Sequence, residues 1–401
     1  MKILVLNSGS SSVKYKLIDT AGKEAKTLAE GGVEKIGLPD GLLKFKLADG
    51  SKQTVELGHI DHKDAIKAIL ANLTDEKVGC IDSYDCIDAV GHRIVHGGEK
   101  FSESVLINDE VIDKVRECYD LAPLHNPANI TGIEAITAIL PNVPQVGVFD
   151  TAFHQTMPAK AYMYALPYKY YKEDGVRRYG FHGTSHRYVS RRACEFLGAD
   201  YEKSRIITCH IGNGASMAAI VDGKCVDTSM GLTPVEGLMM GTRVGDVDPG
   251  ALIYLMNKHS LTPDQLQNLI NKESGVAGVS GLSSDMREIE AAVAAGDKMA
   301  TLALDMYELR ITKYIGAYAA EMDGADIIVF TGGVGENQTG LRANVCKTLG
   351  FMGVTIDAEA NKVRGEEKLI STADSKVKVV VIPTDEELTI ARDTEAIVSA
   401  L

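Results

Sequence analysis

Apolar and polar positions near the start of the chain predict a β-hairpin. Residues 2–6 form a mostly apolar run, and residues 7–12 form a polar turn with one glycine and four serines. In residues 13–17 every second position is apolar, and the positions between them are lysines. A period of two indicates a strand with one buried face, so we expect residues 2–18 to form an antiparallel hairpin.

The same pattern returns in the second half of the chain. Residues 206–221 again read as strand, glycine-rich turn and strand, and an Asp-Gly hairpin turn follows. A further strand, 327–330, runs into a glycine-rich segment, 331–337, that we expect to be a turn. Two similar strand–turn–strand units suggest an internally duplicated fold.

Helices and further strands are expected between these units, as in an α/β fold. The predicted elements are a helix from Ser283 or Ser284 to about Ala295, a helix from Lys298 to Met322, and buried strands at 143–149 and 376–382. No low-complexity linker and no long run of charge interrupts this order. The domain boundary is therefore expected in a compact turn just after Asp150.

Composition and charge exclude several classes of protein. Hydrophobic residues make up 45% and charged residues 24% of the chain, as in ordinary globular proteins. The net charge of −13 argues against a nucleic-acid partner. Seven cysteines without a C-x-x-C pair favour reduced thiols over a disulfide framework or a zinc site. We find no signal peptide and no apolar run long enough for a membrane span, so a cytoplasmic location without a membrane partner is expected.

Three glycine-containing turns, 7–12, 211–214 and 331–337, follow predicted strands, where backbone N–H groups can approach phosphate oxygens. None has the spacing of a P-loop or of a dinucleotide-binding motif. A single turn of this kind is more often only a structural turn. Three of them, with Lys14 beside the first, favour a nucleotide site.

Several basic residues stand in settings that need an explanation. Arg93 lies in an apolar segment, where an arginine needs an anionic partner, although a lone arginine is usually a solvated surface charge. His125 lies in an apolar, turn-rich stretch, and a core histidine bonded to the backbone is an equally good interpretation. Thr184 or Ser185 can cap a helix whose N-terminus attracts anions. Arg243 lies in a glycine-rich loop, as stabilising a phosphoryl group requires.

The segment 383–388 predicts the start of the final helix. Thr384 as N-cap places Glu387 at the third helical position, which is a capping box. Glu386 would then be free to face a Mg²⁺ ion. The alternative is that these acidic residues only complement the helix dipole.

Together these residues resemble the acetate kinase (acetokinase) family, in the superfamily of acetate and sugar kinases, Hsp70 and actin. The resemblance runs from Lys2 to about Arg392 and is carried by the stretches 7–14, 92–98, 121–127, 178–186 and 331–337. It implies a duplicated actin- and Hsp70-like (ribonuclease H-like) α/β fold of two lobes, with the active site in the cleft between them. It also implies reversible, direct in-line transfer of the ATP γ-phosphoryl group to acetate, giving acetyl phosphate and ADP, and a homodimer.

The resemblance also assigns the lobes and the site. Residues 1–150 with the C-terminal helix 385–401 would form the acetate and Mg²⁺ side, and residues 151–384 the nucleotide-binding lobe. Asn7 and Glu386 would place Mg²⁺, for which Mn²⁺ can substitute, and Lys14 would meet the phosphates of ATP or ADP. The implied catalytic residues are Asp150, His182, Arg243 and His125; the acetate site is Arg93 with Val95, Leu124, Phe181 and Pro234; and the nucleotide site is His210, Ile211, Gly212, Asn213, Gly214, Asp285, Met286, Arg287, Gly333, Val334, Gly335, Glu336 and Asn337.

Three positions need comment against this pattern. Asp385 stands where the family usually has Asn, which puts the metal shell in question. Gly333 leaves room for adenine, where a relative that uses pyrophosphate would carry a bulky residue. The family's label of Asp150 as an acid does not follow from a transfer in which no proton moves, so we expect Asp150 to orient an arginine or a Mg²⁺-bound water.

Two other functions compete with this prediction. A propionate or butyrate kinase on the same scaffold would differ only in its preferred acid. An ATP-dependent binding module of the Hsp70 or actin kind would need an interaction domain or a polymerising surface, and it would not need residues that bind a carboxylate.

Overall fold

The computed structural model describes residues 1–22, 24–47, 50–123 and 125–401, which form two compact units. The first unit comprises Met1–Phe153 and Asp385–Leu401, and the second comprises His154–Thr384. The observed boundary follows Phe153, where we expected it just after Asp150. Within the described residues no helix is long and apolar enough to cross a membrane.

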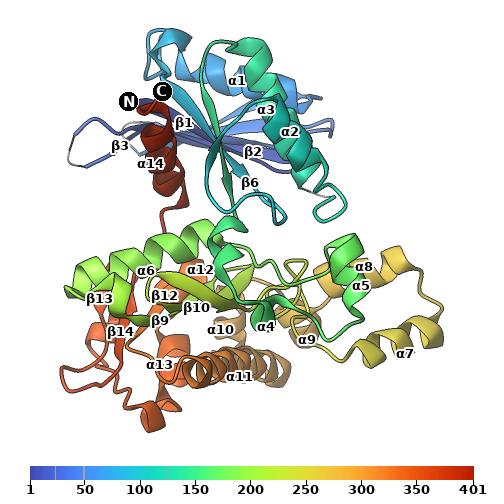
Figure 1. The fold of residues 1–401 in the computed structure, drawn as a ribbon, viewed down its shortest axis with the longest axis vertical. Coiled ribbons are helices and arrows are strands. Elements are labelled where there is room, and N and C mark those ends of the chain that lie inside the picture. Colours follow the sequence, from blue (N-terminus) through green and yellow to red (C-terminus); the bar gives the residue numbers. More distant parts are fainter. Residues whose placement is uncertain (23, 48–49, 124) are drawn as a thin grey trace. The chain divides into compact units, whose positions relative to one another are not determined.

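The first unit is built on an eight-stranded sheet (Figure 1). Its strands are β1 (Lys2–Ser8), β2 (Ser12–Asp19), β3 (Lys26–Glu34), β4 (Gly41–Lys46), β5 (Lys52–Gly58), β6 (Ala89–Ile94), β7 (Val105–Leu106) and β8 (Gln145–Phe149). Its helices are α1 (His62–Leu73), α2 (Asp109–Arg116), α3 (Asn126–Ile139) and α14 (Glu386–Val398), with a 3-10 turn at Tyr84–Cys86.

The strand order β5-β4-β3-β2-β1-β6-β8-β7 mixes two kinds of pairing. β1 pairs antiparallel with β2, which confirms the predicted hairpin, and the register places Asn7 opposite Lys14. β1 also pairs parallel with β6, and β6 pairs parallel with β8. The carboxyl ends of β1, β6 and β8 therefore meet at one edge of the sheet.

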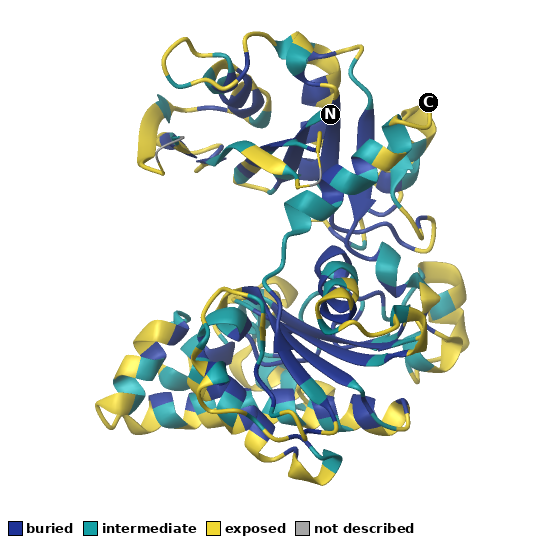
Figure 2. Ribbon diagram, turned by 90° about the vertical axis from the view of Figure 1, so that its left-hand side faces the viewer, coloured by how far each residue is buried: buried dark blue, intermediate teal, exposed yellow. Residues whose placement is uncertain are grey.

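Helices cover both faces of this sheet because successive side chains of β1 point to opposite sides. Leu4 and Leu6 belong to a core that includes apolar residues of α1 and α3. Ile3 and Val5 belong to a second core, with Ile390 and Ala391 of α14. The last helix of the chain is thereby part of the first unit, and Figure 2 shows the central strands of both units as buried.

The second unit is built on a six-stranded sheet with the order β11-β10-β9-β12-β14-β13. Its strands are β9 (Arg205–Ile211), β10 (Ala215–Val221), β11 (Lys224–Thr228), β12 (Ile327–Thr331), β13 (Lys368–Leu369) and β14 (Lys378–Val381). Its helices are α4 (Ala159–Tyr162), α5 (Tyr168–Asp174), α6 (Gly183–Leu197), α7 (Pro249–His259), α8 (Pro263–Lys272), α9 (Gly275–Ser280), α10 (Met286–Ala294), α11 (Lys298–Glu321), α12 (Gly332–Asn337) and α13 (Thr339–Lys347). Short 3-10 helices lie at Tyr201–Lys203, Gly350–Met352 and Ala360–Lys362, and another, Ala152–Thr156, spans the boundary between the units in the sequence.

The two sheets repeat one topology. β9 pairs antiparallel with β10 and parallel with β12, and β12 pairs parallel with β14. This is the arrangement of β1 with β2, β6 and β8 in the first unit. The predicted duplicated α/β fold of two lobes is confirmed. In the second unit, α6 and α11 cover opposite faces of the sheet (Figure 1).

Four local predictions are wrong, three of them at the start of a helix. Residues 332–337 form the short helix α12 rather than a turn. The cap of α10 is Asp285, not Ser283 or Ser284, and α6 begins at Gly183, directly after His182. The cap of α14 is Asp385, one residue after the predicted Thr384. Near α10 and α14 the sequence offers several residues that cap about equally well, so it does not choose among them by itself.

Close packing of α14 against β6 requires a glycine at position 91. A Cβ built there would lie 2.6 Å from Ile390 Cγ2 and 2.6 Å from Thr394 Oγ1. We expect Gly91→Val to push α14 off the sheet and to lower the free energy of unfolding by about 1–3 kcal/mol. The urea midpoint of the circular dichroism signal measures this loss.

The matched control is Gly340→Ala in α13, where an added Cβ meets nothing within 4 Å. It should leave the midpoint unchanged or raise it slightly. Equal losses in the two variants would contradict the packing argument.

Candidate functional site

In the first unit, Arg93 and Asp150 form a buried ion pair. Arg93 lies near the end of β6, and Asp150 directly follows the neighbouring parallel strand β8. Arg93 Nε donates to Asp150 Oδ1 at 3.0 Å, and Nη2 donates to Oδ2 at 2.6 Å. The Asp150 side chain is 1% exposed. Burial lowers the pKa of Arg93, but the carboxylate of Asp150 more than offsets this effect and the pKa is raised. The expectation that Arg93 needs an anionic partner is confirmed.

Asn7, Lys14 and Glu386 lie in the same unit as this pair. Asn7 Oδ1 accepts a hydrogen bond of 3.3 Å from Arg93 Nη1, and Lys14 is exposed opposite Asn7 in the hairpin. Glu386 is the first residue of α14. Burial raises its pKa to about 7, with Arg93 opposing the shift and Asp150 adding to it. A partly buried carboxylate and an amide oxygen beside a second carboxylate are the hard oxygen donors that a divalent cation such as Mg²⁺ prefers.

The structure explains the unusual Asp385. Its carboxylate accepts a hydrogen bond of 3.0 Å from the backbone N–H of Leu388 and so caps α14. Asp and Asn cap helices about equally well, so this position serves the same purpose with either residue. Glu387 is not part of a capping box, because its carboxylate lies 3.4 Å from Lys16 Nζ. The predicted box is wrong, although Glu386 still stands apart from the cap.

Two buried asparagines, which the sequence analysis missed, hold the segment after β6. Asn129 Oδ1 accepts from the N–H of Val95 at 3.1 Å, and Asn129 Nδ2 donates to the carbonyl of Ser8 at 2.7 Å. Asn126 exchanges two hydrogen bonds with the backbone of His96, of 3.1 and 2.9 Å. The sequence pattern that could have indicated them is an Asn-x-x-Asn pair at the start of a helix. Amide groups buried at such a place need definite hydrogen-bond partners.

The remaining predicted residues of the first unit are Val95, His125 and Leu124. Val95 is buried at 6% exposure. His125 occupies the N-cap position of α3 and is partly exposed. Leu124 lies outside the described residues. The other two residues predicted for the acetate methyl pocket, Phe181 and Pro234, belong to the second unit.

In the second unit, His182 and Arg243 meet at Gly214. A Cβ built on Gly214 would lie 3.4 Å from Arg243 Nη1 and 3.7 Å from His182 Nε2. The His182 ring stacks on His210 with centroids 4.3 Å apart. The backbone of His182 is left-handed, with φ of +56°, which is uncommon for a residue other than glycine and is often found at functional sites.

Arg243 differs from Arg93 in its partners. Its Nη1 donates to the carbonyl of Pro234 at 3.0 Å and contacts Met240 Sδ at 3.8 Å. No acidic side chain among the described residues forms an ion pair with it, and burial lowers its pKa. A half-buried guanidinium whose protein partners are neutral is suited to binding an anion.

Arg178 holds the loop that carries Pro234. Its Nη1 donates to the carbonyls of Thr228, Ser229 and Met230 at 2.8, 3.0 and 3.1 Å, and its Nη2 donates to Glu236 Oε1 at 2.7 Å. The carbonyl that orients Arg243 is therefore part of a loop fixed at several points. Phe181, just before His182, is buried, and its carbonyl accepts a hydrogen bond of 2.8 Å from His154 Nε2.

A cavity of about 300 Å³ in the second unit brings the predicted nucleotide stretches together. Residues from all three stretches line it, although His210 and Ile211 do not. The lining residues are Gly212, Asn213, Gly241, Ser284, Asp285, Met286, Tyr307 and Val334. Gly241, Ser284 and Tyr307 were not predicted. The Tyr307 hydroxyl is buried without a hydrogen-bond partner in the protein, so a ligand in this cavity would find a polar group available.

Other predicted nucleotide residues hold the local backbone. Glu336 Oε1 accepts from the N–H groups of Gly332 and Thr384 at 2.8 and 3.2 Å. Asn337 Nδ2 donates to the carbonyl of Gly333 at 2.9 Å. Gly335 is buried, and a Cβ on Gly333 would meet nothing within 4 Å. The space beside Gly333 is open.

Asp285 and Arg287 form an exposed pair at the start of α10. Arg287 Nη2 donates to Asp285 Oδ2 at 2.6 Å, and the backbone N–H of Arg287 donates to Asp285 Oδ1 at 2.9 Å. The side-chain hydrogen bond from Arg287 lowers the pKa of Asp285 to about 2. Since the Arg287 side chain is 87% exposed, it is accessible to a ligand.

Comparison with known proteins gives one consistent family. A model described as the acetokinase family matches residues 2–392. The acetate kinase of Phocaeicola vulgatus is 65% identical over 399 residues, which cover 100% of each chain. The crystal structure of Porphyromonas gingivalis acetate kinase matches with a TM-score of 0.96 at 60% identity, covering 99% of each chain. A propionate kinase from Francisella tularensis matches with a TM-score of 0.91 at 42% identity, covering 98% of this chain and 99% of its own. The chain belongs to the acetokinase family.

Proposed function

We propose that this protein transfers the γ-phosphoryl group of ATP to acetate, reversibly and by direct in-line transfer, giving acetyl phosphate and ADP. The observation that carries this proposal is the half-buried Arg243, which forms no ion pair with an acidic side chain in the described part of the chain and lies with His182 around Gly214. Relatives named acetate kinase, at 60% and 65% identity, support acetate as the substrate over propionate.

The chemistry needs charge neutralisation rather than a general base. Acetate is already an anion at neutral pH, so it can attack phosphorus without losing a proton. The main obstacle is the approach of two anions, and fixed cations in a half-buried site reduce this repulsion. Arg243 and His182 stabilise the transferring phosphoryl group, His125 is a further catalytic residue, and Arg93 binds the acetate carboxylate.

Asp150 acts through Arg93 in this mechanism. It binds Nε and Nη2 and so fixes the plane of the guanidinium group. Nη1, whose bond to Asn7 is long at 3.3 Å, is the edge that meets the acetate carboxylate. Asp150 is therefore a positioning residue, and no proton passes through it.

The first unit would also hold the metal. Asn7 and Glu386 supply oxygen ligands for Mg²⁺, for which Mn²⁺ can substitute, and Lys14 meets the nucleotide phosphates. The metal ion neutralises phosphate charge when bound. The nucleotide occupies the cavity of the second unit, with Asp285 to Arg287 and Gly333 to Asn337 at its edges and His210 to Gly214 beside the phosphates.

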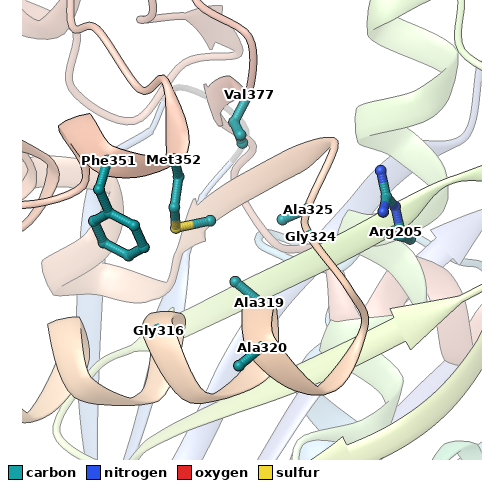
Figure 3. A pocket seen from close by; sticks show the side chains of 9 residues that line it. All are labelled: Arg205, Gly316, Ala319, Ala320, Gly324, Ala325, Phe351, Met352 and Val377. Carbon is teal, nitrogen blue, oxygen red and sulfur yellow. The ribbon is translucent and has the colours of Figure 1, made fainter.

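We also propose a homodimer in a reducing, cytoplasmic compartment. Met299, Leu302, Met306 and Leu309 are between 41% and 55% exposed and recur along one face of α11 at a spacing of three and four residues. Further along α11, Gly316, Ala319 and Ala320 line a cavity beside Phe351, which is 79% exposed (Figure 3). An apolar face of this length supports contact with a second copy. All seven cysteines are free thiols, which supports the reducing compartment.

The first test traps acyl phosphate as the hydroxamate, with ATP, Mg²⁺ and acetate, propionate or butyrate in parallel. We expect strong product with acetate and weak product with the longer acids, because Val95 limits the space for the methyl group. One methylene in such a pocket is worth about 1–3 kcal/mol. Val95→Ala should admit propionate, and an unchanged preference would remove Val95 from the pocket. No product with any acid, despite intact ATP binding, would favour an ATP-dependent binding module.

Loss of Arg243 should affect the transition state more than acetate binding. We expect Arg243→Ala to lower kcat by about 10³-fold while the acetate KM stays nearly constant. Arg192→Ala, which breaks a surface pair with Glu367, is the control and should keep wild-type kinetics. A change in KM alone would refute the role of Arg243.

Asp150→Asn tests the positioning of Arg93. The variant keeps the shape of the side chain but removes the charge, so we expect kcat/KM for acetate to fall by about 10²-fold or more. Asp326→Asn, which breaks a bidentate but exposed pair with Arg205, is the matched control and should remain active. Near-normal turnover of Asp150→Asn would show that this carboxylate has no electrostatic role.

A further inference from the structure

The second unit contains a cluster of four histidines that extends from His182 into the core. The rings of His182 and His210 stack at 4.3 Å, and His186 lies 6.1 Å from His210 and 5.7 Å from His154. His154 and His186 are completely buried. Burial and the neighbouring His154 and His210 lower the pKa of His186 well below its usual value, so this ring is neutral.

Hydrogen bonds connect His182 to this interior through two buried hydroxyl groups. His182 Nδ1 lies 2.9 Å from Ser216 Oγ, and Ser216 Oγ lies 2.7 Å from His186 Nε2. His186 Nδ1 lies 2.7 Å from Thr208 Oγ1. Ser216 and Thr208 are 0% exposed, on the paired strands β10 and β9, so water does not compete for these contacts.

Counting hydrogens leaves two directions for this chain. A hydroxyl group and a neutral imidazole each have one hydrogen to donate. Thr208 Oγ1 either donates to His186 Nδ1 at 2.7 Å, or accepts from Nδ1 and donates to the carbonyl of Ala218 at 3.5 Å, which is a weak hydrogen bond. In the first of these directions His186 carries its hydrogen on Nε2 and donates to Ser216.

The same count of hydrogens gives the tautomer of His182. Because Ser216 accepts from His186, its own hydrogen is available for His182 Nδ1. A neutral His182 must then carry its hydrogen on Nε2. That atom lies toward Gly214 and Arg243, where the phosphoryl group would be transferred. With the chain reversed, a lone pair on Nε2 would face the phosphoryl oxygens and repel them, so the first direction is the one that suits phosphoryl transfer.

We propose that Ser216, His186 and Thr208 are positioning residues that hold His182 as the neutral Nε2–H tautomer, so that it donates a hydrogen bond to the transferring phosphoryl group. The proposal rests on the proposed function, which selects the direction of the chain, whereas the tautomer can be measured on the protein alone. His182 thus acts as a donor without having to be protonated, while Arg243 supplies the charge. The hydrogen-bonded chain explains why neutral polar side chains are buried here.

Nuclear magnetic resonance of protein labelled with ¹⁵N in histidine measures the tautomer directly. Two-bond ¹H–¹⁵N correlations distinguish the two tautomers, and a His182→Asn variant assigns the signal among the ten histidines. We expect the Nε2–H form of His182 in the wild-type protein. Ser216→Ala, which removes the donor to Nδ1, should shift His182 toward a mixture of tautomers. An Nδ1–H tautomer in the wild type, or an unchanged tautomer in Ser216→Ala, would overturn the proposal.

Kinetics test the consequence for transfer. We expect Ser216→Ala to lower kcat for acetyl phosphate formation about tenfold, with the acetate KM within about twofold, and Ser216→Thr to restore most of the rate. The control is Ser190→Ala, which removes another buried hydroxyl of the same unit, bonded to the carbonyl of Arg187 and to Tyr201. An equal loss in Ser190→Ala, or no rescue by Ser216→Thr, would contradict a positioning role.

The tautomer measurement and the kinetics together distinguish a failure of this proposal from a failure of the proposed function. If the wild-type protein forms no acyl phosphate but shows the Nε2–H tautomer, the proposed function fails and the assignment of the chain stands. If Ser216→Ala does not fold, the tautomer of the wild-type protein decides the question. An active wild-type enzyme with the Nδ1–H tautomer would retain the function and refute the chain.

Discussion

Parallel pairing of three central strands is the constraint on which both units depend. In the first unit β1, β6 and β8 run in parallel, and in the second β9, β12 and β14 do so. Parallel strands bring their carboxyl ends to one edge of the sheet, where side chains distant in sequence become neighbours. Asn7, Arg93 and Asp150 meet at such an edge, and so do His210 and the segment that follows Thr331. Predicted site residues of each unit therefore lie at the edge of the sheet where its parallel strands end.

The arginines of the two units differ in their partners. Arg93 is held by a buried carboxylate, which fixes its orientation and leaves one edge for a ligand. Among the described residues, the partners of Arg243 are neutral, a carbonyl and a thioether. A paired arginine is suited to holding a substrate in one geometry, whereas an unpaired one gains most when negative charge comes to it. This division matches the roles proposed for acetate and for the phosphoryl group.

Neutral polar groups provide the support around these charges. Asn126 and Asn129 fix the segment after β6, and Ser216 connects His182 to the interior of the second unit. None of these residues stood out in the sequence, because a single Asn or Ser is common and its importance depends on what it touches. A buried amide or hydroxyl without a partner is costly, so each of them specifies one local arrangement.

The amino-acid sequence by itself determined the elements and the type of chemistry. Alternation along 13–17, the glycine-rich turns and the apolar surroundings of Arg93 are local features, and the structure confirms the hairpins and the need for an anion beside that arginine. Tertiary structure decided which groups meet. Thr384 and Asp385 are both good caps, but Thr384 bonds to Ser185 in the second unit and leaves the cap of α14 to Asp385. Asp150 stands 57 positions from Arg93, and only the pairing of β6 with β8 makes them partners. Local preference depends on neighbours in the chain, whereas a site depends on distances in space, which the packing of the strands sets.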